Sequence, residues 1–473
     1  MKRVFLIVNV IILILISAIW GMRFFSEKEN LYSTKNKEAL KHYKAGVNYT
    51  MMYYVPEARK EFALAIKKDP NFPLPYIFQI MMSRGLKGSN IPDYYKKIAV
   101  PQKNWTEFEK EFTSIFLEYT AKREKIKGDR KFAKRIENFI DKYADRIEIY
   151  PIILPMYQTA IGDTNKLIKY YEYLHEKFPN NTQIINRLGY LYLQKKEYKK
   201  AENAFKKYIF IEPDNANPYD SIADLYYTQG NYKKAIENYQ KALSIKPDFP
   251  NSKIKLALCY IFTGKLKLAE KKLNEILELK NTIPYLTFSA YNIKAILYLL
   301  EGETEKIKEL YQSFNPPKDY FCFKLPIQAF YGYSIKDKNL LSKAIENSEK
   351  CPHFIRQLIA PLKIPLLIWL GKENQAEKLI QSILQKINDL TYDRKVFYIN
   401  LIADYYLEKK EYSKIEKLLP YLNEKDKAYL ELLMAKSQNN KEKCKEFAKK
   451  LLQYYNEADE NFYKKKEALK CLK

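Results

Sequence analysis

The chain has 473 residues and a formal net charge of +26. A single compact core rarely reaches this length, so the sequence indicates several domains or an array of repeats. Glycine is scarce, with 12 residues, and no run of alternating β-branched residues marks a strand, which favours an all-helical protein. The basic residues are spread along the chain and mixed with Glu, a pattern typical of solvated helix surfaces. An acidic partner or an anionic lipid surface is the alternative explanation of the charge.

The chain begins with an apolar segment. The nineteen residues from Val4 to Met22 contain no charged side chain, and at about 1.5 Å per residue they span roughly 28 Å, close to the thickness of a bilayer core. Bulky side chains at Ile19 and Trp20 disfavour cleavage by signal peptidase. We therefore expect residues 1–22 to form an uncleaved signal anchor, a single transmembrane helix, and not a cleaved signal peptide.

Basic residues lie on both sides of this apolar segment in nearly equal number, so they do not decide its orientation. The pair Lys2 and Arg3 directly precedes the apolar residues, as in an export signal, and long domains translocate largely regardless of charge. We expect the rest of the chain on the extracytoplasmic, periplasmic side of the membrane. A cytoplasmic array is the alternative.

Residues 182–215 and 216–249 carry one pattern twice. Large, small, aromatic, Ala, aromatic and Pro residues recur in that order: Leu188 with Ile222, Gly189 with Ala223, Tyr192 with Tyr226, Ala201 with Ala235, Phe205 with Tyr239, and Pro213 with Pro247. A fixed period with this order of sizes is typical of a helix–turn–helix repeat. The two copies closely resemble the tetratricopeptide repeat (TPR) family. The resemblance implies antiparallel helix pairs that stack into a right-handed superhelical solenoid and bind other proteins.

The pattern weakens away from these two copies and divides the chain after the anchor. In order, the sequence predicts a juxtamembrane linker (23–38), N-terminal TPR-like helices (39–147), a core TPR array (148–282), divergent TPR-like hairpins (283–457) and a polar, solvated capping helix (458–473). Gly and Pro residues near 85–103 predict a long loop. Pro361 and Pro365 should interrupt a helix of the divergent region.

No motif for catalysis or metal binding accompanies the repeats. The sequence lacks a phosphate-binding Gly loop, a nucleophile elbow and an HExxH helix, so we expect no catalytic residues, no metal and no cofactor. The five cysteines lack metal-ligand spacing, and their odd number argues against a complete set of disulfides. Cys322 and Cys351 could meet across neighbouring helices, but two ordinary thiols are the favoured interpretation. No motif that reads nucleic acid is present, so we expect no specific nucleic-acid partner.

The first helix of each TPR pair lines the concave surface of a solenoid. Side chains one turn apart on these helices, away from the packing stripe, are therefore predicted to form a partner-binding groove. In three successive copies they are Asn186, Tyr190 and Leu193; Asp220, Asp224 and Tyr227; and Asn251, Ile254 and Leu258. Tyr faces with Asn and Asp hydrogen-bonding groups suit an extended peptide or a partner helix.

The sequence thus predicts a membrane-anchored TPR scaffold that binds a protein or peptide partner in this groove, in the assembly of a bacterial envelope complex. One alternative is an adaptor that faces the cytoplasm at the membrane. The other is an enzyme whose catalytic site lies in the divergent C-terminal half. That enzyme would need a domain in which strands alternate with helices, whereas residues 283–473 predict helical hairpins.

Overall fold

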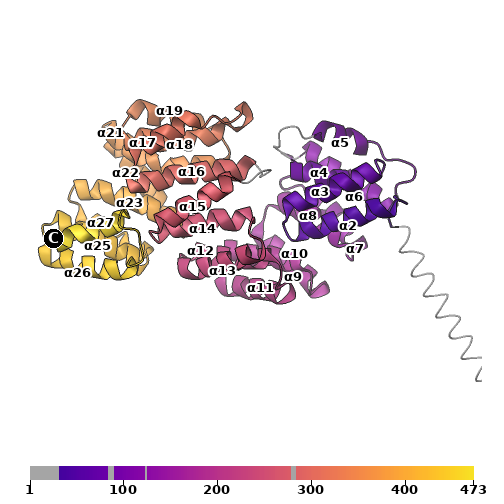
Figure 1. The fold of residues 1–473 in the computed structure, drawn as a ribbon, viewed down its shortest axis with the longest axis horizontal. Coiled ribbons are helices and arrows are strands. Elements are labelled where there is room, and N and C mark those ends of the chain that lie inside the picture. The colour runs from indigo at the N-terminus through magenta and orange to yellow at the C-terminus, as the bar shows by residue number, and fades with distance from the viewer. Residues whose placement is uncertain (1–30, 84–89, 123–124, 279–283) are drawn as a thin grey trace, which may run out of the picture. The chain divides into compact units, whose positions relative to one another are not determined.

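The computed structural model describes residues 31–83, 90–122, 125–278 and 284–473, and all regular structure in these ranges is helical (Figure 1). Consecutive helices pack as antiparallel pairs, which confirms the expected all-helical, TPR-like solenoid. The contacts divide the chain into two compact units, Met1–Ile211 and Glu212–Lys473. The boundary lies inside the span 148–282 that the sequence groups as one array. We refer to the two parts as unit 1 and unit 2.

Unit 1 contains ten α-helices in its described residues. They are α2 (Lys37–Met51), α3 (Val55–Lys68), α4 (Leu74–Ser83), α5 (Ile91–Ile98), α6 (Glu107–Lys122), α7 (Arg130–Lys142), α8 (Tyr150–Ile161), α9 (Thr164–Lys177), α10 (Thr182–Gln194) and α11 (Tyr198–Ile211). Aromatic side chains make up much of its core. Tyr43 and Phe62 are fully buried, and the ring of Phe62 stacks on that of Phe78 at 4.6 Å.

The repeat pattern has a direct steric explanation in the pair α10–α11. The backbone of Gly189 lies against the ring of Phe205, so that even a Cβ atom at this position would overlap the ring. The same arrangement recurs at Gly46 and Phe62 in the pair α2–α3. A small residue on the first helix and an aromatic residue on the second therefore let the two helices approach closely.

Two segments of unit 1 differ from the sequence expectation. The residues predicted as a linker include Tyr32 and Ser33, which dock on the unit: the Tyr32 hydroxyl donates to Glu148 at 2.7 Å, and the Ser33 amide donates to Glu109 at 2.9 Å. The predicted long loop near 85–103 contains the helix α5. Pro92 lies in the first turn of α5, where a missing N–H costs no hydrogen bond, so this proline starts a helix instead of preventing one.

Unit 2 contains sixteen α-helices in its described residues. They are α12 (Ala216–Thr228), α13 (Tyr232–Ile245), α14 (Pro250–Phe262), α15 (Leu266–Leu277), α16 (Pro284–Glu301), α17 (Thr304–Ser313), α18 (Lys324–Ser334), α19 (Lys338–Ser348), α20 (His353–Ile359), α21 (Lys363–Trp369), α22 (Glu373–Gln385), α23 (Tyr392–Glu408), α24 (Tyr412–Glu416), α25 (Glu424–Ser437), α26 (Lys441–Tyr454) and α27 (Tyr463–Leu472). The sequence predicts that prolines interrupt a helix in this region. A short 3-10 turn, Ala360–Leu362, contains Pro361 and separates α20 from α21.

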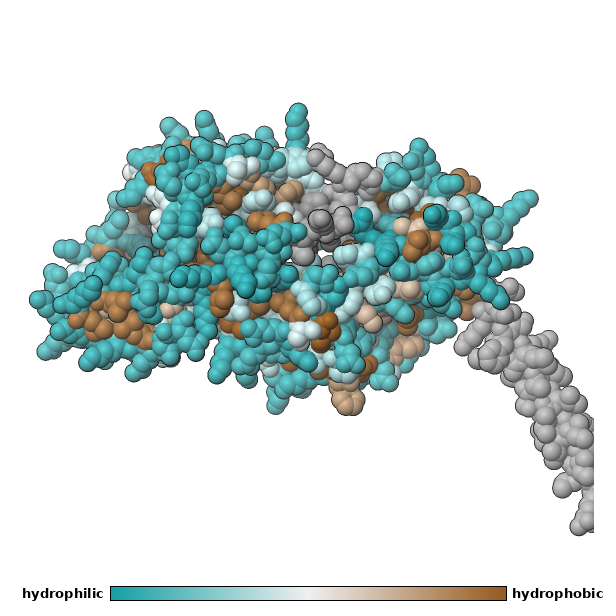
Figure 2. Space-filling model, viewed as in Figure 1, coloured by the Kyte–Doolittle hydropathy of each residue, from teal (hydrophilic) through white to brown (hydrophobic). Residues whose placement is uncertain are grey.

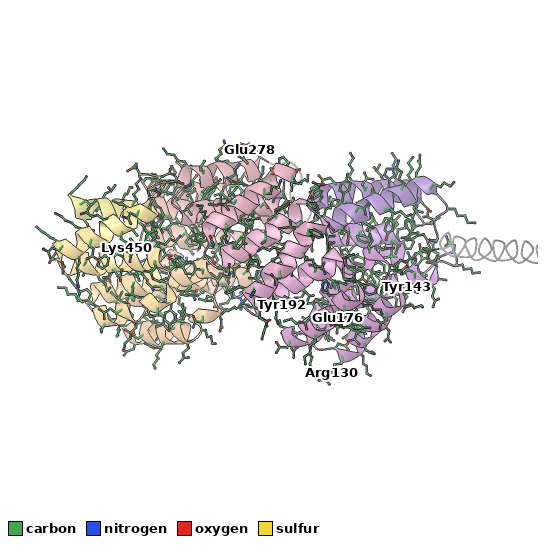
Figure 3. All side chains as sticks on the ribbon, turned by 90° about the horizontal axis from the view of Figure 1, so that it is seen from below. Arg130, Tyr143, Glu176, Tyr192, Glu278 and Lys450 are labelled. Atoms are coloured by element: carbon green, nitrogen blue, oxygen red, sulfur yellow. A yellow bond between two sulfur atoms is a disulfide. The ribbon has the colours of Figure 1, made fainter. Side chains whose placement is uncertain are left out.

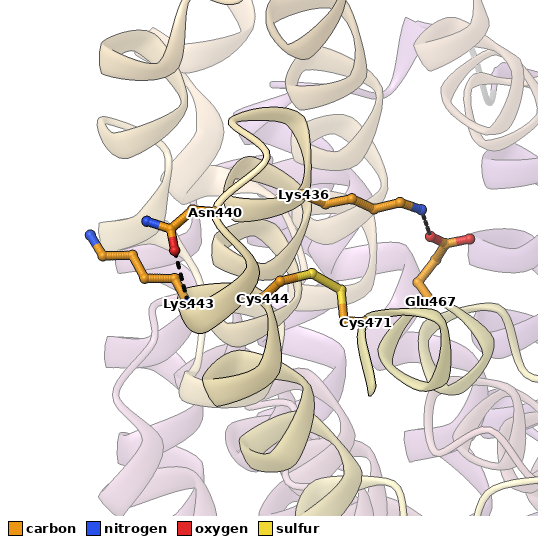
Figure 4. The surroundings of a disulfide bond; sticks show 6 residues. All are labelled: Lys436, Asn440, Lys443, Cys444, Glu467 and Cys471. Carbon is orange, nitrogen blue, oxygen red and sulfur yellow. Dashed lines mark hydrogen bonds and ion pairs between the residues drawn. A yellow bond between two sulfur atoms is a disulfide. The ribbon is translucent and has the colours of Figure 1, made fainter. Parts of the chain in front are cut away.

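Two disulfides connect segments of unit 2, contrary to the interpretation of the cysteines as ordinary thiols. One joins Cys322 to Cys351, with the Cα atoms 5.7 Å apart, and the other joins Cys444 to Cys471, with the Cα atoms 5.6 Å apart. Figure 4 shows the second bridge, which ties α27 to α26 beside the ion pair of Lys436 and Glu467. The remaining cysteine, Cys259, is buried as a free thiol.

The C-terminal segment packs on unit 2 and is less solvated than its polar sequence suggests. On α27, Lys464 and Ala468 are buried. The backbone N–H of Asp459 donates to the carbonyl of Gly264 at 2.8 Å, and the Asp459 carboxylate accepts from the N–H of Lys267. The segment before α27 is therefore attached to the turn between α14 and α15. The long, polar side chain of Lys464 can be buried because it pairs with Asp426 in the interior of the unit, as described below.

Hydrophilic residues cover most of the visible surface, and apolar residues occur there in separate groups (Figure 2). Long side chains project from the outer edges of the helices (Figure 3). Within the described ranges, no helix is both long and apolar enough to cross a bilayer. The segment expected to form the anchor, residues 4–22, lies outside the described residues.

Candidate functional site

A cavity of about 520 Å³ lies inside unit 2. Side chains of α12, α14, α16, α18, α20, α23 and α25 line it, together with the start of α27. Most of these helices are the first members of their pairs, which is the position that a solenoid turns toward its inner surface. Most of the lining is aliphatic or aromatic, with Ile254, Leu258, Ile293 and Phe397 as examples.

Two glycine turns help to place this lining. Gly230 and Gly264 close α12 and α14 in the left-handed backbone region, with φ of +73° and +76°. A side chain at Gly264 would in addition overlap Phe462, so the turn allows the C-terminal segment to approach. Phe462 and the following Tyr463 then contribute to the cavity wall.

One end of the cavity is charged and hydrogen-bonded. The ammonium of Lys464 forms an ion pair with Asp426, and both side chains are almost fully buried. The hydroxyl of Tyr392 donates to the other Asp426 oxygen at 2.6 Å. Burial acts to raise the pKa of the Asp426 carboxyl, but the ammonium groups of Lys464 and Lys425 outweigh burial and hold this pKa below its ordinary value. Breaking such a buried pair by removing one partner is costly, so this arrangement fixes α25 against α27.

Lys425 lies next to this pair and has a different environment. Its ammonium lies over the ring of Tyr232 at 4.6 Å, and its only hydrogen bond in the described part of the chain is a long one, 3.5 Å, to the carbonyl of Phe262. Burial lowers the pKa of Lys425 to about 8. No carboxylate among the described residues lies within ion-pair distance of it. Lys425 is thus a cation in contact with aromatic rings, with the charge of Asp426 nearby but beyond ion-pair distance.

A second polar cluster connects α12, α13 and α14. The Ser252 hydroxyl donates to buried Asp220 at 2.6 Å, and the Tyr239 hydroxyl donates to Asp224. Lys255 lies 3.6 Å from Asp224, and this carboxylate raises the pKa of Lys255. Burial, followed by the charge of Asp224, raises the pKa of Asp220 to about 7. Asp220 therefore binds a proton in the range where an ordinary carboxyl is ionised.

The nine residues of the predicted groove lie in three different environments. Tyr227, Ile254 and Leu258 line the cavity. Asn251 is exposed, and Tyr190 and Leu193 in unit 1 are half-buried. The other three contact neighbouring parts of the protein. Asn186 and Asp220 are only 2% and 4% exposed, and Asp224 accepts a hydrogen bond from the hydroxyl of Tyr239.

Asn186 and Asp220 differ from the prediction because neighbouring elements contact the face that was expected to be open. In unit 2, Ser252 on the next first helix covers Asp220. In unit 1, the Asn186 amide approaches the hydroxyl of Tyr53 at 3.4 Å. Both side chains therefore serve hydrogen bonds between helix pairs, and neither is available to a partner in this structure.

The cavity also contains residues that the repeat pattern did not indicate. They are Asn292, Tyr392, Lys425 and Asp426 of the divergent hairpins and Lys464 of the predicted capping helix. Only a position on a predicted helix marks them in the sequence, because the repeat pattern there is too weak to assign an inner face. No group of three or more His, Cys, Asp or Glu side chains in the described ranges is arranged to hold a metal ion.

Comparison with known families agrees with this geometry. The family model of the tetratricopeptide repeat matches residues 182–215, and a second TPR repeat model matches residues 223–261. The chain contains tetratricopeptide repeats. TPR domains generally bind protein partners, and this part of the chain is a TPR repeat scaffold with that general role. No curated protein sequence matches the chain.

Several solved structures are similar to the chain over long stretches at low identity. A tetratricopeptide repeat protein from Parabacteroides merdae is 15% identical, with a TM-score of 0.38, and the match covers 53% of this chain and 98% of that one. PilF of Pseudomonas aeruginosa is 16% identical, with a TM-score of 0.34, and the match covers 45% and 96%. The Cut9–Hcn1 hetero-tetramer of the APC/C is 11% identical, with a TM-score of 0.43, and the match covers 77% and 76%.

Proposed function

We propose that this TPR protein is held in a bacterial membrane by residues 4–22, presents its helical array on the extracytoplasmic side, and binds a protein or peptide partner of an envelope complex. It acts by binding and not by catalysis. Residues 4–22 support the anchor by their length and lack of charge. The TPR repeats support the binding role.

The pairing of the cysteines supports the extracytoplasmic side. Four of the five cysteines form the bridges Cys322–Cys351 and Cys444–Cys471, and the fifth is buried. Disulfides persist in oxidising compartments and are rare in the cytosol, where thioredoxin and glutathione keep thiols reduced. This observation favours an extracytoplasmic array over an adaptor that faces the cytoplasm.

The location is tested by alkylation of thiols in intact cells, quenched with acid and followed by mass spectrometry of the cysteine-containing peptides. An extracytoplasmic array predicts that the four paired cysteines react only after treatment with a reductant. Cys259 reacts after denaturation without any reductant and serves as the internal control. If all five cysteines are alkylated in denatured samples without reductant, the array is in a reducing compartment and the proposed location is wrong.

The binding surface is tested with a photo-crosslinking amino acid. Asn251 is an exposed position at the start of the first helix α14, whereas Glu237 is an exposed position on the second helix α13. A partner on the inner surface should be crosslinked from position 251 and not from position 237. Capture of the same partner only from position 237 would place binding on the outer surface and contradict the groove.

A further inference from the structure

The cavity of unit 2 has the dimensions and lining of a small-molecule site. Binding pockets for organic ligands have volumes of about 300–1,000 Å³ and combine apolar walls with a few fixed polar groups. The volume here is about 520 Å³. Ile254, Leu258 and Ile293 belong to its apolar wall, and charged side chains gather on α23, α25 and the start of α27.

The charges that face the cavity do not balance. Four cationic side chains line it, namely Lys255, Lys425, Lys464 and Arg394, against two carboxylates, Asp393 and Asp426. Lys464 has Asp426 as its partner, and Lys255 has Asp224 outside the lining. Lys425 has aromatic rings and a distant backbone carbonyl instead. The neighbouring Asp426 already pairs with Lys464, so the cavity offers the ammonium of Lys425, which has no ion-pair partner among the described residues, to an anion.

Two polar atoms in the wall lack hydrogen-bond partners within the described residues. They are the amide oxygen of Asn292, whose side chain is 4% exposed, and one carboxylate oxygen of Asp393. Buried acceptors without a donor are unusual in proteins, because losing water without replacement is unfavourable. A ligand that carries a hydroxyl or N–H group, or a water that accompanies it, would satisfy them.

The helices and the C-terminal segment around the cavity limit what it can hold. α12 and α14 line one part of the wall, and α25 and the start of α27 line another. The C-terminal segment that joins them is hydrogen-bonded to the α14–α15 turn through Asp459 and Gly264. A volume of about 520 Å³ is typical of a small-molecule site and is small for a peptide that threads along a groove.

We propose that unit 2 binds an amphipathic organic anion, with its anionic head group at Lys425 and its aliphatic or aromatic chain along the apolar wall. This site shares Tyr227, Ile254 and Leu258 with the predicted partner-binding groove, but its test does not need the protein partner. An anion at Lys425 gains a charge-assisted hydrogen bond and relieves the cost of burying an unpaired ammonium.

The test uses the full-length protein in phosphatidylcholine nanodiscs and decanoate as the probe, measured by isothermal titration calorimetry. Empty discs correct for partition into lipid. Lys425→Met removes the charge and keeps much of the side-chain length. Lys427→Met is the matched control, because Lys427 lies on the same helix and pairs with Glu424 at 2.9 Å on the surface. We expect Lys425→Met to weaken decanoate binding about 10- to 100-fold and the control to bind as the unchanged protein does.

Two further measurements separate a charge effect from damage to the fold. Lys425→Arg should bind decanoate within a few-fold of the unchanged protein, and decan-1-ol should bind at least tenfold more weakly than decanoate. Titrations near pH 8 in buffers of different ionisation enthalpy should show proton uptake on binding, and Lys425→Met should lose it. The other titratable groups that face Lys425 are Asp426, Lys464, Cys259, Tyr232 and Tyr455.

The proposal is overturned by any of four results, and three of them concern affinity. These three are the absence of decanoate binding beyond that of empty discs, equal affinity of the Met variants at positions 425 and 427 for decanoate, and equal affinity of the unchanged protein for decanoate and decan-1-ol. If an apolar peptide with an amidated C-terminus displaces decanoate at equal concentration, the cavity is a peptide subsite and not a site for small amphipathic anions.

Discussion

Replacing Asp220 by Asn should stabilise the protein at alkaline pH and have little effect at acid pH. The Asp220 carboxyl is buried, and burial with the neighbouring Asp224 raises its pKa from 3.8 to about 7. The folded protein therefore binds this proton more tightly than the unfolded chain does. The stability that comes from the proton is complete below the unfolded pKa of 3.8, and it is lost as the pH rises through 7.

The size of the effect follows from these two pKa values. A difference between 3.8 and about 7 corresponds to an upper limit of about 4 kcal/mol at pH 8 and less than about 2 kcal/mol at pH 5. The positive charge of Lys255 near the same carboxylates and local relaxation of the structure reduce the cost of ionising Asp220. We therefore expect Asp220→Asn to raise the free energy of unfolding by about 1–3 kcal/mol at pH 8. The asparagine oxygen can still accept the hydrogen bond from Ser252.

The measurement is urea unfolding followed by far-ultraviolet circular dichroism at pH 4, 6 and 8, with hydrogen exchange of α12 and α14 as a local readout. Asp224→Asn is the control. It keeps an oxygen that can accept from Tyr239 but removes the negative charge beside Lys255, so it should destabilise the protein at pH 6 and 8. A stability difference between Asp220→Asn and the unchanged protein that does not depend on pH would refute the reasoning.

Three further predictions follow from the packing. Gly189→Ala forces a methyl group against the ring of Phe205 and should lower the free energy of unfolding by about 1–3 kcal/mol, measured by urea unfolding. Reduction of the bridge Cys444–Cys471, which spans 27 residues, should cost about 3–4 kcal/mol on the loop-closure model and increase hydrogen exchange in α27. Asp459→Ala removes the acceptor for a backbone N–H of α15 and should increase exchange in both α15 and α27.

Each of these predictions has its own control. Glu460→Ala changes the residue next to Asp459, but its carboxylate is 80% exposed, so exchange in α15 should stay unchanged. Reduced protein should keep the protection of α10 and α11, which lie in unit 1 and contain no cysteine. Unchanged stability of Gly189→Ala would mean that the α10–α11 pair can separate to admit a methyl group.

The helix pairs could be predicted from the sequence because their packing is local. Gly189 and Phe205 contact each other within one pair, so the required sizes recur at a fixed spacing. Side-chain exposure was harder to predict, since it depends on the next pair. Asp220 has the residue type of a surface position, yet Ser252 of the following pair covers it and bonds to it. A polar residue on an inner helix can face a ligand or a neighbouring pair, and the repeat pattern does not distinguish these two cases.

The position of the C-terminal segment at the cavity could not be predicted for a related reason. The contacts between Lys265 and Glu457 and between Lys267 and Asp459 each join residues 192 positions apart. In a regular solenoid each repeat contacts only its neighbours, so such contacts have no place in a one-dimensional pattern. Here they attach the C-terminal segment to the middle of the array and bury Lys464 against Asp426. The half of the chain that lines the cavity makes these distant contacts as well as contacts between neighbouring pairs, and a one-dimensional repeat pattern indicates only the second kind.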